Sequence, residues 1–227
     1  MLPEWARQRR LPWKLRWLKY IRLSRPVLSA RVIAADLRGD PKAPSLMLQT
    51  FGEELLGETL AACKKVGMTP FLAFGTLLGH CRDGGFIKHD ADIDLGILEG
   101  DRPKMAALAE EMRRRGYVVR LHTERELSFY RPHMPTLLVD FFVFFRKGDD
   151  VAYYDQRGET VYEYRFPREV FAELAPARFL GRLDAFIPGR AEQFLEVSYG
   201  DWRTPRTAFD NVHGHPNCTV VEQGAGH

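Results

Sequence analysis

Residues 71–98 read FLAFGTLLGHCRDGGFIKHDADIDLGIL, and this stretch decides the fold. A short apolar run over 70–74 stops at Gly75-Thr76, and the following residues have the pattern of a strand that turns into a helix. A second apolar run, 93–98, comes directly after a group of acids. Strands and helices that alternate in this way predict a mixed α/β or α+β domain.

The sequence on both sides of this stretch indicates the same fold class. Helical spacing of apolar residues predicts a helix over 46–65, and Gly116 ends a second predicted helix over 103–115. The run 136–145 is apolar except for Asp140, which is typical of a central strand buried on both faces. A strand, a hairpin around Gly158 and a last helix are also predicted, over 117–121, 153–165 and 190–199.

The N-terminal region is strongly basic. Residues 1–31 contain nine Lys or Arg and one acid, a net charge of +8, and the whole chain carries +3, which leaves −5 for the rest. Tryptophan and leucine are interleaved with these cations, so residues 1–33 are predicted to contact anionic lipid. The alternatives are an amphipathic helix that covers part of the core, or an arm with nonspecific attraction to nucleic acid. We divide the chain into this arm (1–40), a central domain (41–208) and a C-terminal tail (209–227).

Length and composition indicate the size of the domain and the cellular compartment of the protein. The 227 residues are enough for one domain with a substantial core. Three widely spaced cysteines, Cys63, Cys81 and Cys218, are too few to cross-link it, which favours a reducing, cytoplasmic compartment. No run of about 18 uncharged apolar residues occurs, so no membrane span is predicted, and the charged N-terminal region is unlike a signal peptide. We therefore expect a cytoplasmic protein that is peripheral at the inner face of the cell membrane.

Three carboxylates alternate along residues 90–94. On a strand edge, Asp90, Asp92 and Asp94 would all point to one face, where like charges are unfavourable unless a cation joins them. Mg²⁺ is bound by one or two protein carboxylates together with phosphate oxygens of the substrate. Asp140 is the natural third member, because an unpaired carboxylate in an apolar run is costly to bury. The alternatives are a solvated strand face, a calcium loop, or an Asp140 that pairs with an arginine.

Gly75-Thr76 supplies an anion site beside these acids. A glycine turn that opens a helix points backbone amides and a hydroxyl at a phosphate. Together with the acids, it describes metal-assisted phosphoryl or nucleotidyl transfer.

Two motifs resemble the LicD family, the group that also contains fukutin and fukutin-related protein. The first runs from Phe74-Gly75-Thr76-Leu77-Leu78-Gly79 through Arg82 and Gly85-Phe86-Ile87 to Asp90-Ala91-Asp92-Ile93-Asp94-Leu95-Gly96. The second, Tyr199-Gly200-Asp201-Trp202-Arg203-Thr204-Pro205, resembles the element that closes many LicD domains. The resemblance covers residues 46–205. It implies a nucleotidyltransferase-like mixed sheet flanked by helices.

The resemblance also implies a reaction, which is transfer of a phospho-alcohol from a CDP-linked donor to a sugar hydroxyl with release of CMP. Phosphocholine, ribitol phosphate and glycerol phosphate are the donor groups in such relatives, and the acceptor would be a glycan of the cell envelope or capsule, in some cases lipid-linked. Asp92, Asp94 and Asp140 would be the catalytic residues and hold Mg²⁺ or Mn²⁺. The residues expected to bind substrate are Gly75 and Thr76 as a diphosphate cradle, Arg82 as a phosphate clamp, and Lys88, His89 and Asp90 beside the donor.

This chain departs from the family pattern just before the acids. Lys88-His89 stands where many relatives have Pro-Trp, and Ala91 stands where they have a further Asp. Asp92 and Asp94, the two acids expected to hold the metal ion, are both present, but the specificity for the donor is left open. Two other functions also remain open, namely a nucleotidyltransferase that attacks an α-phosphate and releases pyrophosphate, and a noncatalytic membrane-associated scaffold.

The histidines near the C-terminus are a weak indication of a metal site. His213, His215 and Cys218 could contribute to a zinc site, but a fourth ligand is missing. We therefore expect a solvated tail here.

Overall fold

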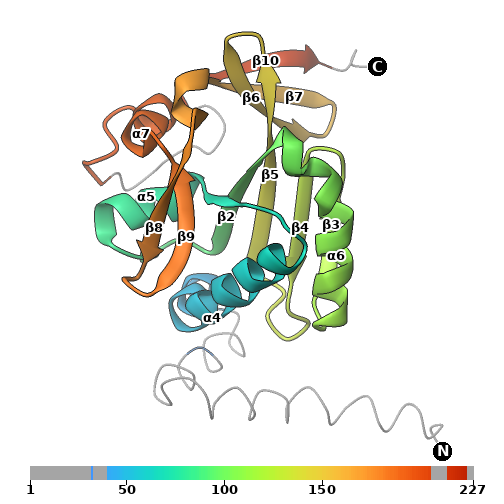
Figure 1. Cartoon of the computed structure of the whole chain (residues 1–227). Helices are drawn as coiled ribbons and strands as arrows, with labels where there is room; N and C mark the ends of the chain where they lie inside the picture. Colours follow the sequence, from blue (N-terminus) through green and yellow to red (C-terminus); the bar gives the residue numbers. More distant parts are fainter. Residues whose placement is uncertain (1–31, 33–39, 206–213, 224–227) are drawn as a thin grey trace, which may run out of the picture.

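The computed structural model describes Val32 and residues 40–205 and 214–223 (Figure 1). Residues 1–31 of the predicted arm lie outside the described residues, as does His213. The proposed boundaries at residues 40 and 208 and the lipid contact of residues 1–33 therefore stay predictions.

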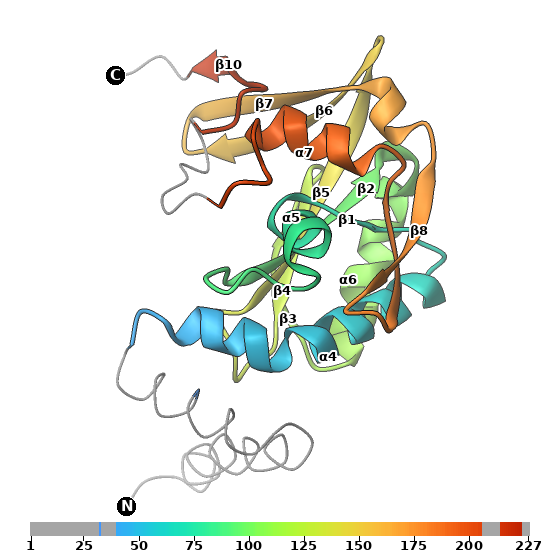
Figure 2. The same cartoon turned by 90° about the vertical axis from the view of Figure 1, so that its left-hand side faces the viewer.

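The helices predicted from the sequence are present. They are α4 (Ala43–Lys65), α5 (Phe74–Asp83), α6 (Met105–Arg114) and α7 (Ala191–Tyr199), with 3-10 helices at Glu99–Lys104 and Arg168–Phe171. Helices α4 and α6 pack together near β2, β3 and β4, and α5 and α7 pack together beside β2 (Figure 2). No helix of the described ranges is both long and apolar enough to cross a bilayer.

The strands form an eight-stranded mixed sheet and a separate hairpin. The sheet strands are β1 (Phe71–Leu72), β2 (Asp92–Leu98), β3 (Val118–His122), β4 (Glu126–Tyr130), β5 (Leu138–Lys147), β6 (Asp150–Arg157), β7 (Thr160–Pro167) and β10 (Cys218–Gln223). Their order is β1-β2-β5-β6-β7-β10, and β4 also pairs with β5 and carries β3 at its edge. Strands β2 and β5 are parallel, and the other pairs are antiparallel. The hairpin consists of β8 (Leu174–Phe179) and β9 (Leu183–Pro188). The predicted mixed α/β sheet flanked by helices is confirmed.

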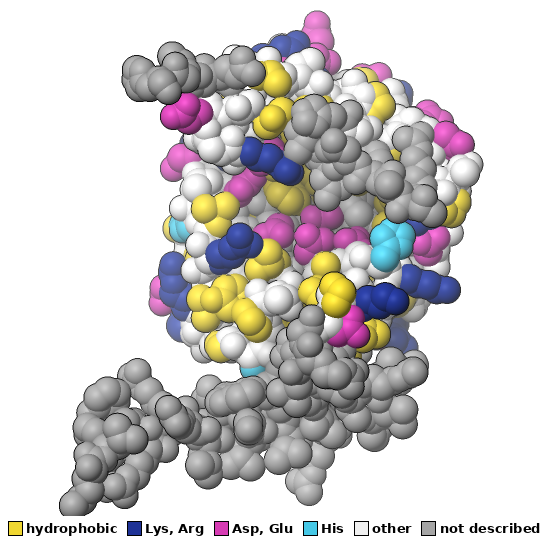
Figure 3. Space-filling model, turned by 180° about the vertical axis from the view of Figure 1, so that it is seen from behind, with side chains coloured by type: hydrophobic (Ala, Val, Ile, Leu, Met, Phe, Trp, Pro, Cys, Tyr) yellow, Lys and Arg dark blue, Asp and Glu magenta, His cyan; other side chains and the backbone are white. Residues whose placement is uncertain are grey.

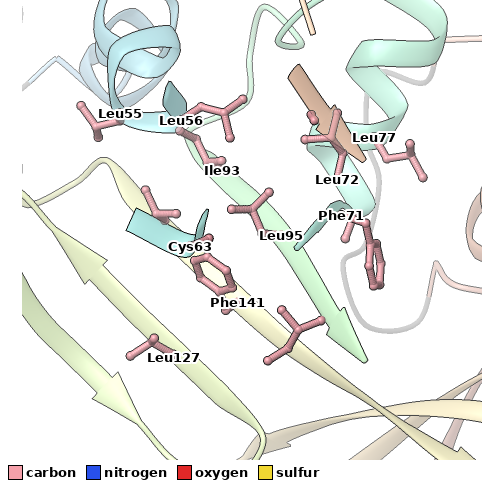
Figure 4. Close-up of a cluster of buried hydrophobic side chains, with 14 of the residues drawn as sticks. Leu55, Leu56, Cys63, Phe71, Leu72, Leu77, Ile93, Leu95, Leu127 and Phe141 are labelled. Carbon is pink, nitrogen blue, oxygen red and sulfur yellow. The ribbon is translucent and has the colours of Figure 1, made fainter. Parts of the chain in front are cut away.

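Strand β2 separates the core from the acids. Because side chains alternate along a strand, Ile93, Leu95 and Ile97 share one face and are fully buried. Figure 4 shows Ile93 and Leu95 in a cluster with Leu55 and Leu56 of α4 and with Phe141 of β5. The same alternation places Asp92 and Asp94 on the opposite face.

Strand β5 differs from its prediction. Residues 136–145 were expected to be buried on both faces, but burial alternates along β5. Val139, Phe141 and Val143 are buried, whereas Asp140 and Phe142 are half-buried. The reason is a cavity against the second face, which Asp140 and Phe142 line.

The region predicted as a solvated C-terminal tail contains a strand. Residues 218–223 form β10, which pairs antiparallel with β7 from Cys218 opposite Tyr164 to Gln223 opposite Thr160. Strand β10 covers what would otherwise be an open edge of the sheet. The described part of the tail is therefore part of the fold.

Candidate active site

A cavity of about 540 Å³ lies on the acidic face of β2 and β5. Figure 3 shows acidic side chains gathered at the centre of one face of the molecule, with basic and hydrophobic side chains around them. The walls come from five strands of the sheet, β2 to β6, and from β7, α5, α7 and the segment before β10. The residues that line it are Phe74, Gly75, Asp90, Asp92, Asp94, Arg120, Leu121, Glu126, Ser128, Asp140, Phe142, Tyr153, Asp155, Arg157, Tyr164, Tyr199 and His215.

The parallel register of β2 and β5 brings the predicted acids together. Asp94 and Asp140 are Cα partners, and Asp92 lies two residues earlier on the same face of β2. Asp90 precedes the strand and also lines the cavity. The structure therefore gathers all four carboxylates named from the sequence.

The carboxylates have a raised affinity for protons. Burial, followed by the charge of Asp92, raises the pKa of Asp90 to about 7. Burial raises the pKa of Asp140 to about 6. Burial raises the pKa of Asp94 well above its ordinary value, and the neighbouring acids raise it further. Such a group of like charges favours the binding of a cation.

A divalent cation fits this site only with help from the substrate. Among residues 40–205 and 214–223, no three His, Cys, Asp or Glu side chains are arranged to hold an ion by themselves. Mg²⁺ does not need such a cage, because one or two carboxylates and substrate phosphates complete its shell. The half-buried carboxylates of Asp92 and Asp94, with Asp140 opposite Asp94 on β5, fit this type of site.

Gly75 and Thr76 hold Asp94. The Gly75 backbone N–H donates to Asp94 Oδ2 over 2.9 Å, and Asp94 N–H donates to Thr76 Oγ1 over 2.9 Å. Thr76 is 1% exposed, and its bond from Asp94 N–H shows that its hydroxyl is directed at β2. A Cβ at position 75 would lie 2.6 Å from Asp90 Oδ2 and 3.1 Å from Asp94 Oδ2, so a larger residue would displace these carboxylates. These bonds give Gly75 and Thr76 a positioning role toward Asp94, and their expected role as a diphosphate cradle stays a prediction.

The residue before this glycine has an unusual backbone. Phe74 has a φ of +37°, a conformation that side chains other than glycine rarely adopt. Its ring packs on Phe142 and Tyr153, with centroids 5.3 Å and 5.6 Å away. Strained backbone of this kind is found at functional sites, where packing holds it in place.

The cations expected from the sequence do not line the cavity. Arg82, in the last turn of α5, pairs with the adjacent Asp83, and Lys88 and His89 are exposed. The cations that do line it are Arg120 of β3 and Arg157 of β6, which pairs with Asp155 over 2.7 Å. Sequence reasoning missed both, because no spacing near the acid motif points to them and only the strand order brings them there.

The position of His215 was not foreseen either. It was expected in a solvated tail, but it is 9% exposed and its Nδ1 lies 2.8 Å from Ser198 O. Cys218 begins β10, and burial raises the pKa of its thiol. The described residues around His215 and Cys218 form no zinc site.

Comparisons with known proteins agree with the motifs. A family model described as LicD/FKTN/FKRP, nucleotidyltransferase domain, matches residues 67–189. Among curated proteins, the ribitol-5-phosphate transferases FKTN of Mus musculus and of Homo sapiens are each 24% identical over 194 residues. These matches cover 83% of this chain and 41% of each relative, so the chain spans less than half the length of these relatives.

Two solved structures are similar at low sequence identity. The lincomycin-bound lincosamide antibiotic adenylyltransferase LnuA has a TM-score of 0.42 and 16% identity, covering 63% of this chain and 84% of that chain. ANT(2")-Ia in complex with adenylyl-2"-tobramycin has a TM-score of 0.41 and 17% identity, covering 60% of this chain and 68% of that chain.

The family match extends over more than half of the chain, and it contains the four acids of the cavity and the Gly75-Thr76 pair that positions them. The chain therefore belongs to the LicD/FKTN/FKRP family of nucleotidyltransferase domains.

Proposed function

We propose that this chain is a phosphorus-group transferase that moves a phospho-alcohol from a CDP-linked donor to a sugar hydroxyl and releases CMP. The observation that carries the proposal is the placement of Asp92, Asp94 and Asp140 side by side on one face of β2 and β5, at the wall of a cavity. Family membership and the similarity to ribitol-5-phosphate transferases support ribitol phosphate as the first donor group to test, ahead of phosphocholine and glycerol phosphate.

Asp92, Asp94 and Asp140 would hold Mg²⁺ or Mn²⁺. The ion would neutralise charge on the phosphates as CMP leaves. The chain itself prepares this site, since the Gly75 N–H keeps the Asp94 carboxylate turned toward the cavity. Substrate oxygens would complete the coordination, as is usual for Mg²⁺ in proteins.

Arg120 and Arg157 would bind the donor phosphates. Both guanidinium groups line the same cavity as the acids, and Arg120 is exposed at its rim. Arginine binds phosphate through two parallel hydrogen bonds and so fixes orientation as well as charge. Tyr153, Tyr164 and Phe142 give the cavity an aromatic wall that would contact the donor and exclude water.

The acceptor is proposed to be a glycan of the cell envelope or capsule, and lipid-linked acceptors fit a basic N-terminal arm. Contact of residues 1–33 with anionic lipid is tested by sedimentation with anionic vesicles, because deletion of the arm should abolish binding. Binding that does not change on deletion would end the lipid proposal. Specific recognition of nucleic acid is not part of the proposed function.

The reaction is tested by incubating the protein with CDP-ribitol, CDP-glycerol, CDP-choline and nucleoside triphosphates, with Mg²⁺ or with a chelator. We expect CMP from one CDP-alcohol, loss of CMP with the chelator, and loss of turnover in Asp92→Asn. Asp184→Asn is the matched control, because this exposed acid of β9 pairs with Arg178 away from the cavity. Pyrophosphate released from a triphosphate would overturn the proposal in favour of nucleotidyl transfer.

A further inference from the structure

The segment before β10 completes the cavity, although it lies beyond the residues that the family model matches. That match ends at residue 189, whereas His215 is one of the lining residues. The segment is held by the backbone of β7, since Arg165 N–H donates to Asn217 O over 3.1 Å and Asn217 Nδ2 donates to Arg165 O over 2.9 Å. His215 is therefore carried to the cavity by an anchored turn.

The His215 ring is enclosed by aromatic side chains from three elements. Its centroid lies 5.1 Å from that of Tyr199 of α7, 5.3 Å from that of Tyr164 of β7 and 6.1 Å from that of Phe74 of α5. All three of these residues line the cavity as well. The ring thus has a defined orientation in the wall.

One hydrogen bond decides which ring nitrogen carries the proton. Nδ1 lies 2.8 Å from the Ser198 carbonyl oxygen, which can only accept, so Nδ1 is the donor. In the neutral ring the lone pair is then on Nε2. A histidine whose tautomer is set by a backbone carbonyl is suited to take a proton at Nε2.

We propose that His215 is the general base that takes the proton of the acceptor hydroxyl. This inference rests on the proposed function. The acceptor oxygen forms a bond to the phosphorus that bears the alcohol, and the bond from that phosphorus to the bridging oxygen of CMP breaks. CMP leaves with the electron pair of that bond, while the hydroxyl proton passes to His215 Nε2 and then to solvent. Asp92, Asp94 and Asp140 are assigned to the cation, and His215 is the histidine among the residues that line the same cavity.

A purely structural role predicts something different. Ser198 is in the last turn of α7, where carbonyl groups lack partners within the helix, so the Nδ1 bond also caps that helix. His215→Asn distinguishes the two roles, because its side-chain amide can donate to Ser198 O from the position of Nδ1 but leaves no base at Nε2. His122→Asn is the control, since His122 is an exposed histidine of β3 that does not line the cavity.

The test measures CMP release, donor affinity by calorimetry, and Tm for the full chain and its variants. We expect His215→Asn to lower kcat by about 100-fold or more, with donor Kd and Tm close to those of the wild type, and His122→Asn to match the wild type. A folded His215→Asn variant with kcat within about threefold of the wild type would overturn the assignment of His215 as the general base and would leave the proposed function unaffected. If His215→Asn does not fold, His215→Gln is judged by the same kcat criterion. A wild-type protein that releases no CMP from any CDP-alcohol would overturn this inference together with the proposed function.

Discussion

The metal-free protein should lose stability as the pH rises from 5 to 8, and Asp90→Asn should remove much of that loss. Burial and the charge of Asp92 raise the pKa of Asp90 from 3.8 to about 7. Between these two values the folded state binds more protons at this carboxyl than the unfolded state does, so the free energy of unfolding falls as the pH rises. The destabilisation caused by the Asp90 charge is absent at a pH below 3.8, the pKa in the unfolded state, and complete at a pH above about 7, the pKa in the folded state.

The size of the effect follows from the two pKa values. A tenfold change in proton affinity is worth about 1.4 kcal/mol, so the Asp90 charge costs up to about 4 kcal/mol at pH 8, of which about 3 kcal/mol develops between pH 5 and pH 8. In a chain of this length, 1 kcal/mol moves Tm by roughly 2 to 4 °C. Asp90→Asn should therefore raise the Tm of the metal-free protein at pH 8 by up to about 8 to 16 °C, and by much less at pH 5.

Thermal unfolding with a chelator at both pH values measures this difference. Asp90→Asn keeps a side-chain oxygen to accept the Ala91 N–H bond, which is 3.0 Å long in the wild type, so the substitution removes mainly the charge. Asp184→Asn serves again as the exposed control and should behave like the wild type at both pH values. A difference in Tm between Asp90→Asn and the wild type that is the same at pH 5 and pH 8 would refute the idea that buried like charges meet at this cavity.

Further predictions concern the positions that hold the site and the fold. Gly75→Ala should lower kcat by about 100-fold, because its Cβ would lie 2.6 Å from Asp90 Oδ2 and displace the carboxylates. Gly57→Ala is the control in the middle of α4, where the added Cβ meets only an ordinary contact at 3.5 Å. This control should keep its activity and gain about 0.5 to 1 kcal/mol of stability in denaturant unfolding. Arg131→Met should destabilise the fold by about 2 kcal/mol in the same assay, because the buried guanidinium pairs with Glu54 and Glu58 of α4. The loss is limited because these glutamates are 35% and 34% exposed, so water can hydrate them once the arginine is removed. Gly79→Ala should cost about 3 kcal/mol, because its Cβ would meet a backbone oxygen of the following loop at 2.3 Å, and a wild-type Tm would contradict this packing.

Local sequence patterns were sufficient to predict most of the elements. The apolar spacing of 46–65 and the glycine after 103–115 give helices close to the observed α4 and α6, and Gly158 lies in the turn of the β6–β7 hairpin. Strands β4, β8, β9 and β10 were not predicted. Strand β10 has exposed valines at 220 and 221 and gains its partner only from β7, which is far away in the sequence.

The acids of the site were predictable because they lie on one strand or interrupt an apolar run. Asp92 and Asp94 share a face by simple alternation, and Asp140 stands out among apolar neighbours. The positively charged and proton-accepting parts were not predictable in this way. Arg120, Arg157 and His215 come from β3, β6 and the segment before β10, and only the strand order brings them to one cavity.

Three consecutive residues explain why the acid motif needs the turn before it. Phe74 takes a strained backbone conformation and anchors it with its ring, Gly75 leaves space for two carboxylates and donates to one of them, and Thr76 accepts the backbone N–H of Asp94. None of these bonds requires a substrate, so the turn places Asp94 before any donor arrives. Because the carboxylates repel one another, this placement has a cost in stability that the surrounding aromatic packing offsets. Substitutions in the turn should therefore change kcat through the position of Asp94 more than they change the affinity for the donor.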